Sequence, residues 1–136
     1  MENLGPKELY NLAKDRLEDA KVLLKAMRRD GAFYICGYAV ELGLKYAICK
    51  TLGWEDYPAT GRGSEKYKSF KTHDFEVLLH LSGREKQIKK EFLTEWSILM
   101  KWNSETRYSS QEQTSDEVGL MIEATETLLN HVWNKS

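Results

Sequence analysis

The stretch GYAVELGLKYA, residues 37–47, is apolar on almost every side of a helix and yet carries two charges, Glu41 and Lys45. Their spacing places both charges on one face of that helix. The helix around them, expected over residues 32–52, is apolar around nearly its whole circumference, which is typical of the centre of a helical bundle. Because burying a charged pair without further partners is costly, the pair is expected either to hold the structure together or to serve a site.

Helical periodicity on both sides of this stretch predicts the neighbouring elements. Apolar residues recur at helical spacing over residues 6–29, which predicts a first helix. Gly31 marks a short turn after it, so the first helix should be an antiparallel neighbour of the central one. Two further helices are expected over about 84–102 and about 115–133, each with an apolar stripe facing the core.

Cap residues indicate where other helices begin. The segment THDFEVLLHLSG, residues 72–83, reads as a short helix with Thr72 or Asp74 available as its N-cap. The final helix opens with Thr114-x-x-Glu117, which is the spacing of a capping box. These signals place helix starts at both positions.

The pattern as a whole predicts an all-α fold. No segment shows the sustained alternation of a strand, and there is no internal repeat. We expect one domain, residues 1–136, folded as an antiparallel helical bundle of about five helices. A long loop at about 53–72 interrupts the helices, and a loop of this length in a small domain is usually functional, ordered by a partner, or mobile.

The composition is that of a globular domain. Hydrophobic residues make up 41% and charged residues 30% of the 136 residues, and the net charge of −1 argues against binding nucleic acid by bulk charge alone. No apolar run reaches the roughly 20 residues of a membrane span, and the N-terminal sequence lacks the order of a signal peptide. Cys36 and Cys49 are expected to be buried free thiols. We therefore expect a cytoplasmic protein with no membrane segment, metal or cofactor.

Positive charge gathers in one part of the long loop. Residues 59–73 contain four basic side chains and one acidic side chain. The basic residues are Arg62, Lys66, Lys68 and Lys71. This segment is a candidate for contacting phosphates, whereas the acidic segment 111–127 is more simply read as a solvated face.

A polar strip follows one face of the central helix. Its residues are Tyr34, Gly37, Tyr38, Glu41, Lys45 and Ile48. One interpretation is structural: Glu41 bonds Lys45 or a tyrosine hydroxyl and fixes helix packing. The other is functional: the strip lines a groove for a ligand or partner chain, and Gly37 allows a close approach.

Other polar residues lie where helices begin or end. His73 and Asp74 open the short third helix, and histidine is the side chain most easily poised as an acid or base near neutral pH. A histidine at this position is also a common cap or packed ring. Arg107 and Tyr108 follow the fourth expected helix and could bind an anion and stack on it, or anchor the loop. No motif of a metalloprotease, zinc ribbon, P-loop or serine hydrolase is present.

Three segments together resemble a HEPN domain, a helical family often paired with minimal nucleotidyltransferases. They are YICGYAVELGLKYAICKTLG, KTHDFEVLLHLSG and ETRY, in this order and at these distances. The resemblance extends from the first helix to about Tyr108 and implies a HEPN-like bundle that commonly dimerises. Carried over residue by residue, it implies a candidate binding site. The site consists of Tyr38, Glu41, Lys45, His73, Asp74, Arg107 and Tyr108.

The sequence departs from the ribonuclease members of that family. Those members carry R-x(4–6)-H, in which the histidine acts in metal-independent RNA cleavage and the arginine stabilises phosphate charge. Here the positions four to six beyond Arg107 hold Gln111, Glu112 and Gln113, and no histidine follows until His131. A glutamine cannot exchange a proton near neutral pH, so the usual ribonuclease activity is not expected.

Three functions are left open by the sequence. The first is a non-catalytic HEPN-type binding module for nucleotide or RNA, or for a nucleotidyltransferase partner, in a toxin–antitoxin or defence system. The second is a ribonuclease with a displaced active site around His73 and Arg107. The third is a purely structural helical dimerisation domain. A homodimer is expected, because the apolar central helix and four tryptophans offer more apolar surface than five short helices readily cover.

Overall fold

A computed structural model describes residues 4–58, 72–102 and 113–134, and within these ranges the fold is all-helical. The helices are α1 (Pro6–Lys25), α2 (Arg29–Leu52), α3 (Phe75–Ser82), α4 (Glu85–Glu91), α5 (Leu93–Leu99) and α6 (Ser115–Leu128), with a short π-helix, Leu129–Trp133, continuing α6. The expectation of an all-α helical bundle is confirmed.

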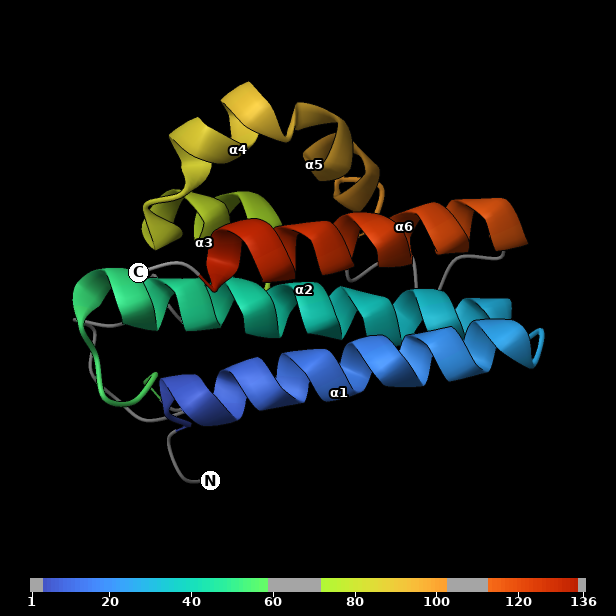
Figure 1. Cartoon of the computed structure of the whole chain (residues 1–136), viewed down its shortest axis with the longest axis horizontal. Helices are drawn as coiled ribbons and strands as arrows, with labels where there is room; N and C mark the ends of the chain where they lie inside the picture. Colours follow the sequence, from blue (N-terminus) through green and yellow to red (C-terminus); the bar gives the residue numbers. More distant parts are fainter. Residues whose placement is uncertain (1–3, 59–71, 103–112, 135–136) are drawn as a thin grey trace.

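Helix α2 is the centre of the molecule, as its apolar circumference predicts. Helix α1 runs antiparallel along one side of α2, and α6 and α3 lie along the other (Figure 1). Twelve of the residues of α2 are buried, Glu41 among them. The shorter helices α4 and α5 form an arch over α3 and α6 (Figure 1). The polar strip of α2 therefore lies close to the start of α3.

The turn between α1 and α2 differs from the expected one. Gly31 lies inside α2, and the chain reverses at residues 26–28 instead. Met27 adopts a left-handed backbone with φ of 64°, and the N–H of Arg28 donates to the carbonyl of Leu23 at 2.8 Å. This is the hydrogen bond of a helix C-terminal turn that usually carries glycine. The sequence analysis misplaced the turn because methionine, and not glycine, occupies the left-handed position.

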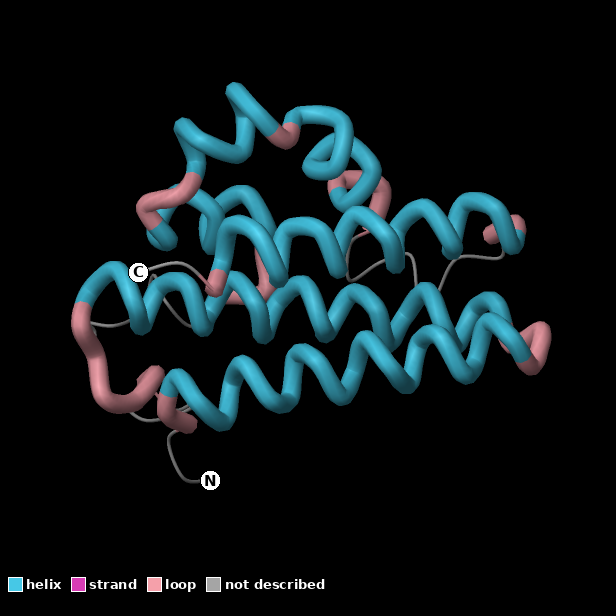
Figure 2. The backbone as a smooth tube through the Cα atoms, in the orientation of Figure 1, coloured by secondary structure: helices cyan, strands magenta, loops and turns pink. Residues whose placement is uncertain are grey.

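The helix expected over 84–102 is divided in two, so six α-helices replace the expected five within the described residues. The break falls at Phe92, whose φ of −130° and ψ of 32° lie outside the helical region. Figure 2 shows the break as a short pink segment between two cyan helices. On either side of the break, Ile88 of α4 and Trp96 of α5 are both buried. No glycine or proline marks this position in the sequence.

The expected apolar stripe of the last helix is confirmed. Its five residues, Val118, Ile122, Thr125, Leu129 and Val132, are all buried. Thr114 and Glu117 form the predicted capping box, with the Glu117 N–H donating to the Thr114 hydroxyl and the Thr114 N–H donating to the Glu117 carboxylate, both at 3.1 Å. This cap fixes where the helix begins.

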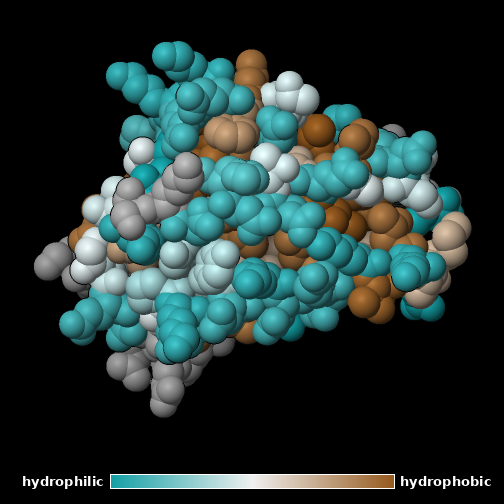
Figure 3. Space-filling model, in the orientation of Figure 1, coloured by the Kyte–Doolittle hydropathy of each residue, from teal (hydrophilic) through white to brown (hydrophobic). Residues whose placement is uncertain are grey.

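The surface is mostly hydrophilic on the face shown in Figure 3, with hydrophobic atoms in stripes between the helices. Among the described residues, one helix, Arg29–Leu52, has the length and composition to cross a membrane. Of its most apolar window, 67% is buried within the protein, which is also the pattern of a bundle's core helix.

Candidate functional site

The buried carboxylate of Glu41 joins two parts of the chain. Its Oε2 accepts a hydrogen bond from Lys45 Nζ, one turn further along α2, at 2.9 Å. Its Oε1 lies 2.8 Å from Nδ1 of His73, in the segment just before α3. Glu41 is only 5% exposed, so both oxygens find partners within the protein. The prediction of a buried, hydrogen-bonded Glu41 paired with Lys45 is confirmed, and His73 is a further partner.

This arrangement fixes the tautomer of His73. A carboxylate bound to an ammonium group is ionised and can only accept hydrogen bonds. Nδ1 of His73 must therefore carry a proton and donate to Glu41. In the neutral ring, the other nitrogen, Nε2, is then an acceptor with a free lone pair. The His73 side chain is 60% exposed, so its ring is accessible.

Lys45 is held by an aromatic ring as well as by Glu41. Its ammonium lies 5.3 Å from the centre of the ring of Tyr57, which comes from the segment after α2. The backbone N–H of Tyr57 donates to the carbonyl of Leu4 at 2.7 Å, which attaches that segment to the N-terminus. Burial raises the pKa of the Tyr57 phenol, and the nearby Cys49 and Glu41 add to this. Sequence reasoning missed Tyr57, because it lies in a loop with no periodic pattern.

A pocket of about 450 Å³ opens beside His73. Its walls come from the segment before α3, the first turn of α3 and the end of the α5 region. The lining residues are Thr72, His73, Asp74, Phe75, Glu76, Met100 and Trp102. The resemblance pointed to only His73 and Asp74 among them. Helical spacing predicted Trp102 as a core residue, which its burial confirms, but not as a pocket wall.

The apolar wall of the pocket is a stack of two aromatic rings. Phe75 and Trp102 lie parallel, with ring centres 5.1 Å apart and an interplanar angle of 10°. The Trp102 ring packs directly against Gly37 of α2, where the Cβ atom of any other residue would collide with the ring. Tyr38 meets the edge of Trp102 at 6.3 Å between centres, and its hydroxyl lies 3.0 Å from that of Tyr34. The polar strip of α2 therefore contacts Trp102, one of the residues that line the pocket.

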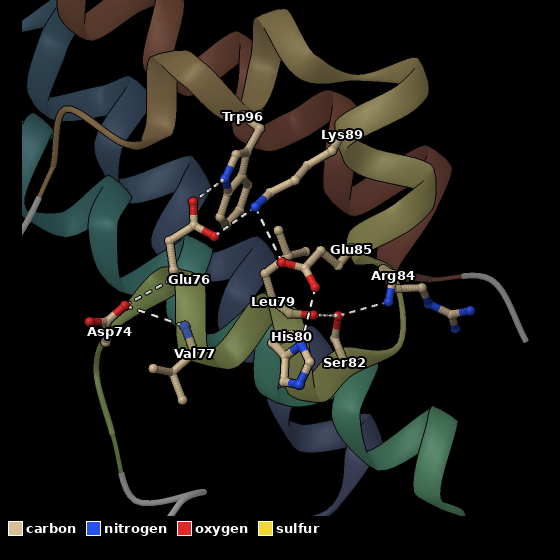
Figure 4. Close-up of polar contacts among 10 residues, drawn as sticks. All are labelled: Asp74, Glu76, Val77, Leu79, His80, Ser82, Arg84, Glu85, Lys89 and Trp96. Carbon is tan, nitrogen blue, oxygen red and sulfur yellow. Dashed lines mark hydrogen bonds and ion pairs between the residues drawn. The ribbon is translucent and has the colours of Figure 1, made fainter.

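The two carboxylates of the pocket have different partners. Oδ1 of Asp74 caps α3 by accepting from the backbone N–H groups of Glu76 at 2.9 Å and Val77 at 3.3 Å. Glu76 accepts from the indole N–H of Trp96 at 3.2 Å and pairs with Lys89 of α4 at 3.2 Å (Figure 4). The charge of Glu76 is thus balanced by Lys89, and both of its oxygens have partners. Asp74 uses only Oδ1 to cap its helix.

The remaining predicted residues divide into two groups. Tyr38 lies on the same face of α2 as Glu41 and contacts Trp102. Arg107, Tyr108 and the basic loop residues lie outside the described residues. The structure thus brings together Glu41, Lys45 and His73 directly, with Asp74 beside them at the pocket.

The cysteines do not belong to the site. Burial raises the pKa of the Cys36 thiol to about 12 and that of Cys49 to about 11. Neutral buried thiols are poor nucleophiles and poor metal ligands. Within the described ranges, no three histidine, cysteine or carboxylate side chains are grouped so that they could hold a metal ion.

Comparison of the chain with protein-family models, with curated proteins and with solved structures finds no match. The class that the fold defines is an all-helical bundle. Function must therefore be argued from the site itself.

Proposed function

We propose that this protein is a non-catalytic HEPN-type binding module, which binds nucleotide or RNA or a nucleotidyltransferase partner within a toxin–antitoxin or defence system. The observation that supports it best is the position of His73. Its Nδ1 is held by the buried Glu41, and its exposed ring lines a pocket. A histidine needed only for packing would gain little from such exposure, whereas a binding residue needs both a fixed orientation and access to its ligand.

The HEPN assignment rests on the order of three sequence segments, and the all-helical fold is compatible with it. The glutamate and lysine of the A-x-E-x-x-x-K stretch lie on the central helix, and the T-H-D stretch meets them at the start of α3. Binding by the basic loop would be dominated by charge and should weaken as salt concentration rises.

A second candidate, a ribonuclease with a displaced active site, is favoured by one observation. A carboxylate that holds one ring nitrogen of a histidine, as Glu41 holds His73 at 2.8 Å, orients the other nitrogen as a general base. Such a base would take the proton of a ribose 2′-hydroxyl as its oxygen attacks the adjacent phosphorus. The bond from phosphorus to the 5′-oxygen of the next nucleotide would break, and that oxygen would leave with a proton from water. The pocket itself opposes this function, because the carboxylate of Asp74, which no cation among the described residues pairs with, would repel the phosphate. The stabilising cation would have to come from Arg107 or from the basic loop.

One experiment separates the two candidates. A fluorescently labelled single-stranded RNA is incubated with the purified protein in the presence of a chelator, which suppresses metal-dependent contaminants. Binding is followed by fluorescence anisotropy over a series of salt concentrations, and cleavage by gel electrophoresis. We expect no cleavage. Cleavage that is lost in His73→Ala would overturn the non-catalytic proposal and favour the ribonuclease.

A homodimer stays a prediction, and one of its reasons is weakened. Trp96, Trp102 and Trp133 are each at most 5% exposed within a single chain, so they need no second copy to cover them. Light scattering at micromolar concentration measures the mass directly. A mass near 15.8 kDa would exclude the homodimer and with it the purely structural dimerisation domain.

A further inference from the structure

The pocket beside His73 offers hydrogen-bond acceptors. Because Nδ1 of His73 donates to Glu41, the neutral ring can present only an acceptor at Nε2. Oδ2 of Asp74 accepts no hydrogen bond from any described residue, since both cap bonds go to Oδ1. The two groups are neighbours in sequence and line the same pocket. A ligand that donates hydrogen bonds would satisfy both.

The charges around the pocket also favour a cation over an anion. The positive charge of Lys45 is matched by Glu41 at 2.9 Å, and that of Lys89 is shared between Glu76 and Glu85, each at 3.2 Å. Asp74 has no cation paired with it among the described residues. Its carboxylate also occupies the N-terminus of α3, where a phosphate would otherwise be favoured. A bound anion would thus meet negative charge that no cation of the described residues compensates.

The apolar wall of the pocket suits the methylene groups of a long side chain. Met100 is half-buried at the pocket, and the stacked rings of Phe75 and Trp102 form the wall behind it. Long basic side chains place their methylene groups on apolar surface and keep the charged end near acceptors. A pocket with acceptors on one side and apolar atoms on the other matches that distribution.

We propose that this pocket binds a cationic nitrogen group, a guanidinium or an alkylammonium on an aliphatic stem, and not a phosphate. The inference rests on the proposed binding function and assigns this part of the site to a basic partner. Any nucleotide or RNA would then have to bind elsewhere. The cation would donate to Nε2 of His73 and to Oδ2 of Asp74, with its stem against Met100.

The test is a ¹H–¹⁵N NMR titration that follows the backbone amides of residues 73–76 and the indole N–H of Trp102. The cationic probes are agmatine, which represents a free guanidinium, and a capped tripeptide with arginine between two glycines, which represents a protein side chain. Inorganic phosphate and adenosine monophosphate are the anionic probes. We expect saturable shifts of these signals with one or both cationic probes. The arm that binds more tightly identifies the source of the cation.

Two charge-matched variants make the test specific. Asp74→Asn keeps a good N-cap residue and removes the charge, so we expect α3 to stay folded and the cation affinity to fall at least about threefold. Glu123→Gln removes one charge from an exposed position on α6 and should leave the affinity unchanged. His73→Ala should weaken binding by a similar factor, although it leaves all carboxylates of the pocket in place.

The inference is overturned if the anionic probes shift these signals and the cationic probes do not, or if Asp74→Asn binds the cations as tightly as the unsubstituted protein. It is also overturned if no probe shifts them. In each of these cases, RNA binding measured by anisotropy can still succeed through other residues. The failure of this inference is thus separable from the failure of the proposed function.

Discussion

Replacement of Gly37 by alanine tests how the central helix and the pocket are joined. A Cβ atom at Gly37 would lie 2.0 Å from Cε2 of Trp102 and 2.4 Å from both its Cζ2 and its Nε1. Such separations are far shorter than van der Waals contact, so the indole must move. It has little freedom to do so, because it is 5% exposed and stacked on Phe75.

Two opposing effects set the size of the change. Alanine is favoured over glycine inside a helix by about 1 kcal/mol. Overpacking a core costs about 1–3 kcal/mol, and a rigid indole at 2.0 Å places Gly37→Ala at the upper end of that range. The net expectation is a loss of about 2 kcal/mol in the free energy of unfolding. For a chain of 136 residues, this corresponds to a melting temperature lower by roughly 6 °C.

Gly119→Ala is the matched control. Gly119 also lies within a helix, but the nearest atom to its added Cβ, Cδ2 of Leu24, is 3.9 Å away. This substitution should therefore gain about 0.5–1 kcal/mol. Urea and thermal unfolding followed by circular dichroism measure both variants. If Gly37→Ala proved as stable as Gly119→Ala, Trp102 would not be packed against α2 as described, and the apolar wall of the pocket would have to be reconsidered.

Three further changes have defined outcomes. Thr114→Ala removes the N-cap of α6 and should lower the free energy of unfolding by about 1 kcal/mol in urea titrations, with Thr114→Ser close to the unsubstituted protein. Glu41→Gln removes the charge from a buried ion pair and should cost about 1–3 kcal/mol, whereas Glu126→Gln at a half-exposed pair should cost less than about 1 kcal/mol. Burial raises the pKa of Cys36 to about 12 and of Cys49 to about 11, so unfolded thiols ionise first as pH rises. Thermal stability should therefore fall above about pH 9, less steeply in Cys36→Ala, and a flat profile would contradict the burial of these thiols.

Periodicity and caps predicted the elements that depend on local sequence. The apolar circumference of α2 predicted its central position, and the burial of Glu41 beside Lys45 followed from their spacing. The errors fall where local signals are weak. Met27 occupies a left-handed position that usually signals itself by glycine, and Phe92 ends a helix without glycine or proline.

The site was less predictable than the fold because its contacts join distant segments. Glu41 and His73 are 32 residues apart, and nothing in the periodicity of either segment pairs them. Tyr57 reaches Lys45 from a loop, which a backbone bridge between Tyr57 and Leu4 attaches to the N-terminal segment. The resemblance to a family placed His73 and Lys45 in the same candidate site. The structure was needed to show that both contact the carboxylate of Glu41.

The unequal exposure of Glu41 and His73 decides between a structural contact and a binding site. Glu41 is 5% exposed, whereas the His73 side chain is 60% exposed, so most of the His73 ring lies outside the core. A hydrogen bond with one partner so exposed adds little stability, and the second partner of the carboxylate, Lys45, keeps Glu41 paired when the imidazole is removed. A structural role would require the opposite result, with His73→Ala about as costly as Glu41→Gln. A histidine held in place for a ligand should instead leave the free energy of unfolding within about 1 kcal/mol of its original value while weakening binding at the pocket at least about threefold. Measuring stability and binding on the same His73→Ala sample distinguishes the two roles, because only the ligand-binding role separates the two quantities.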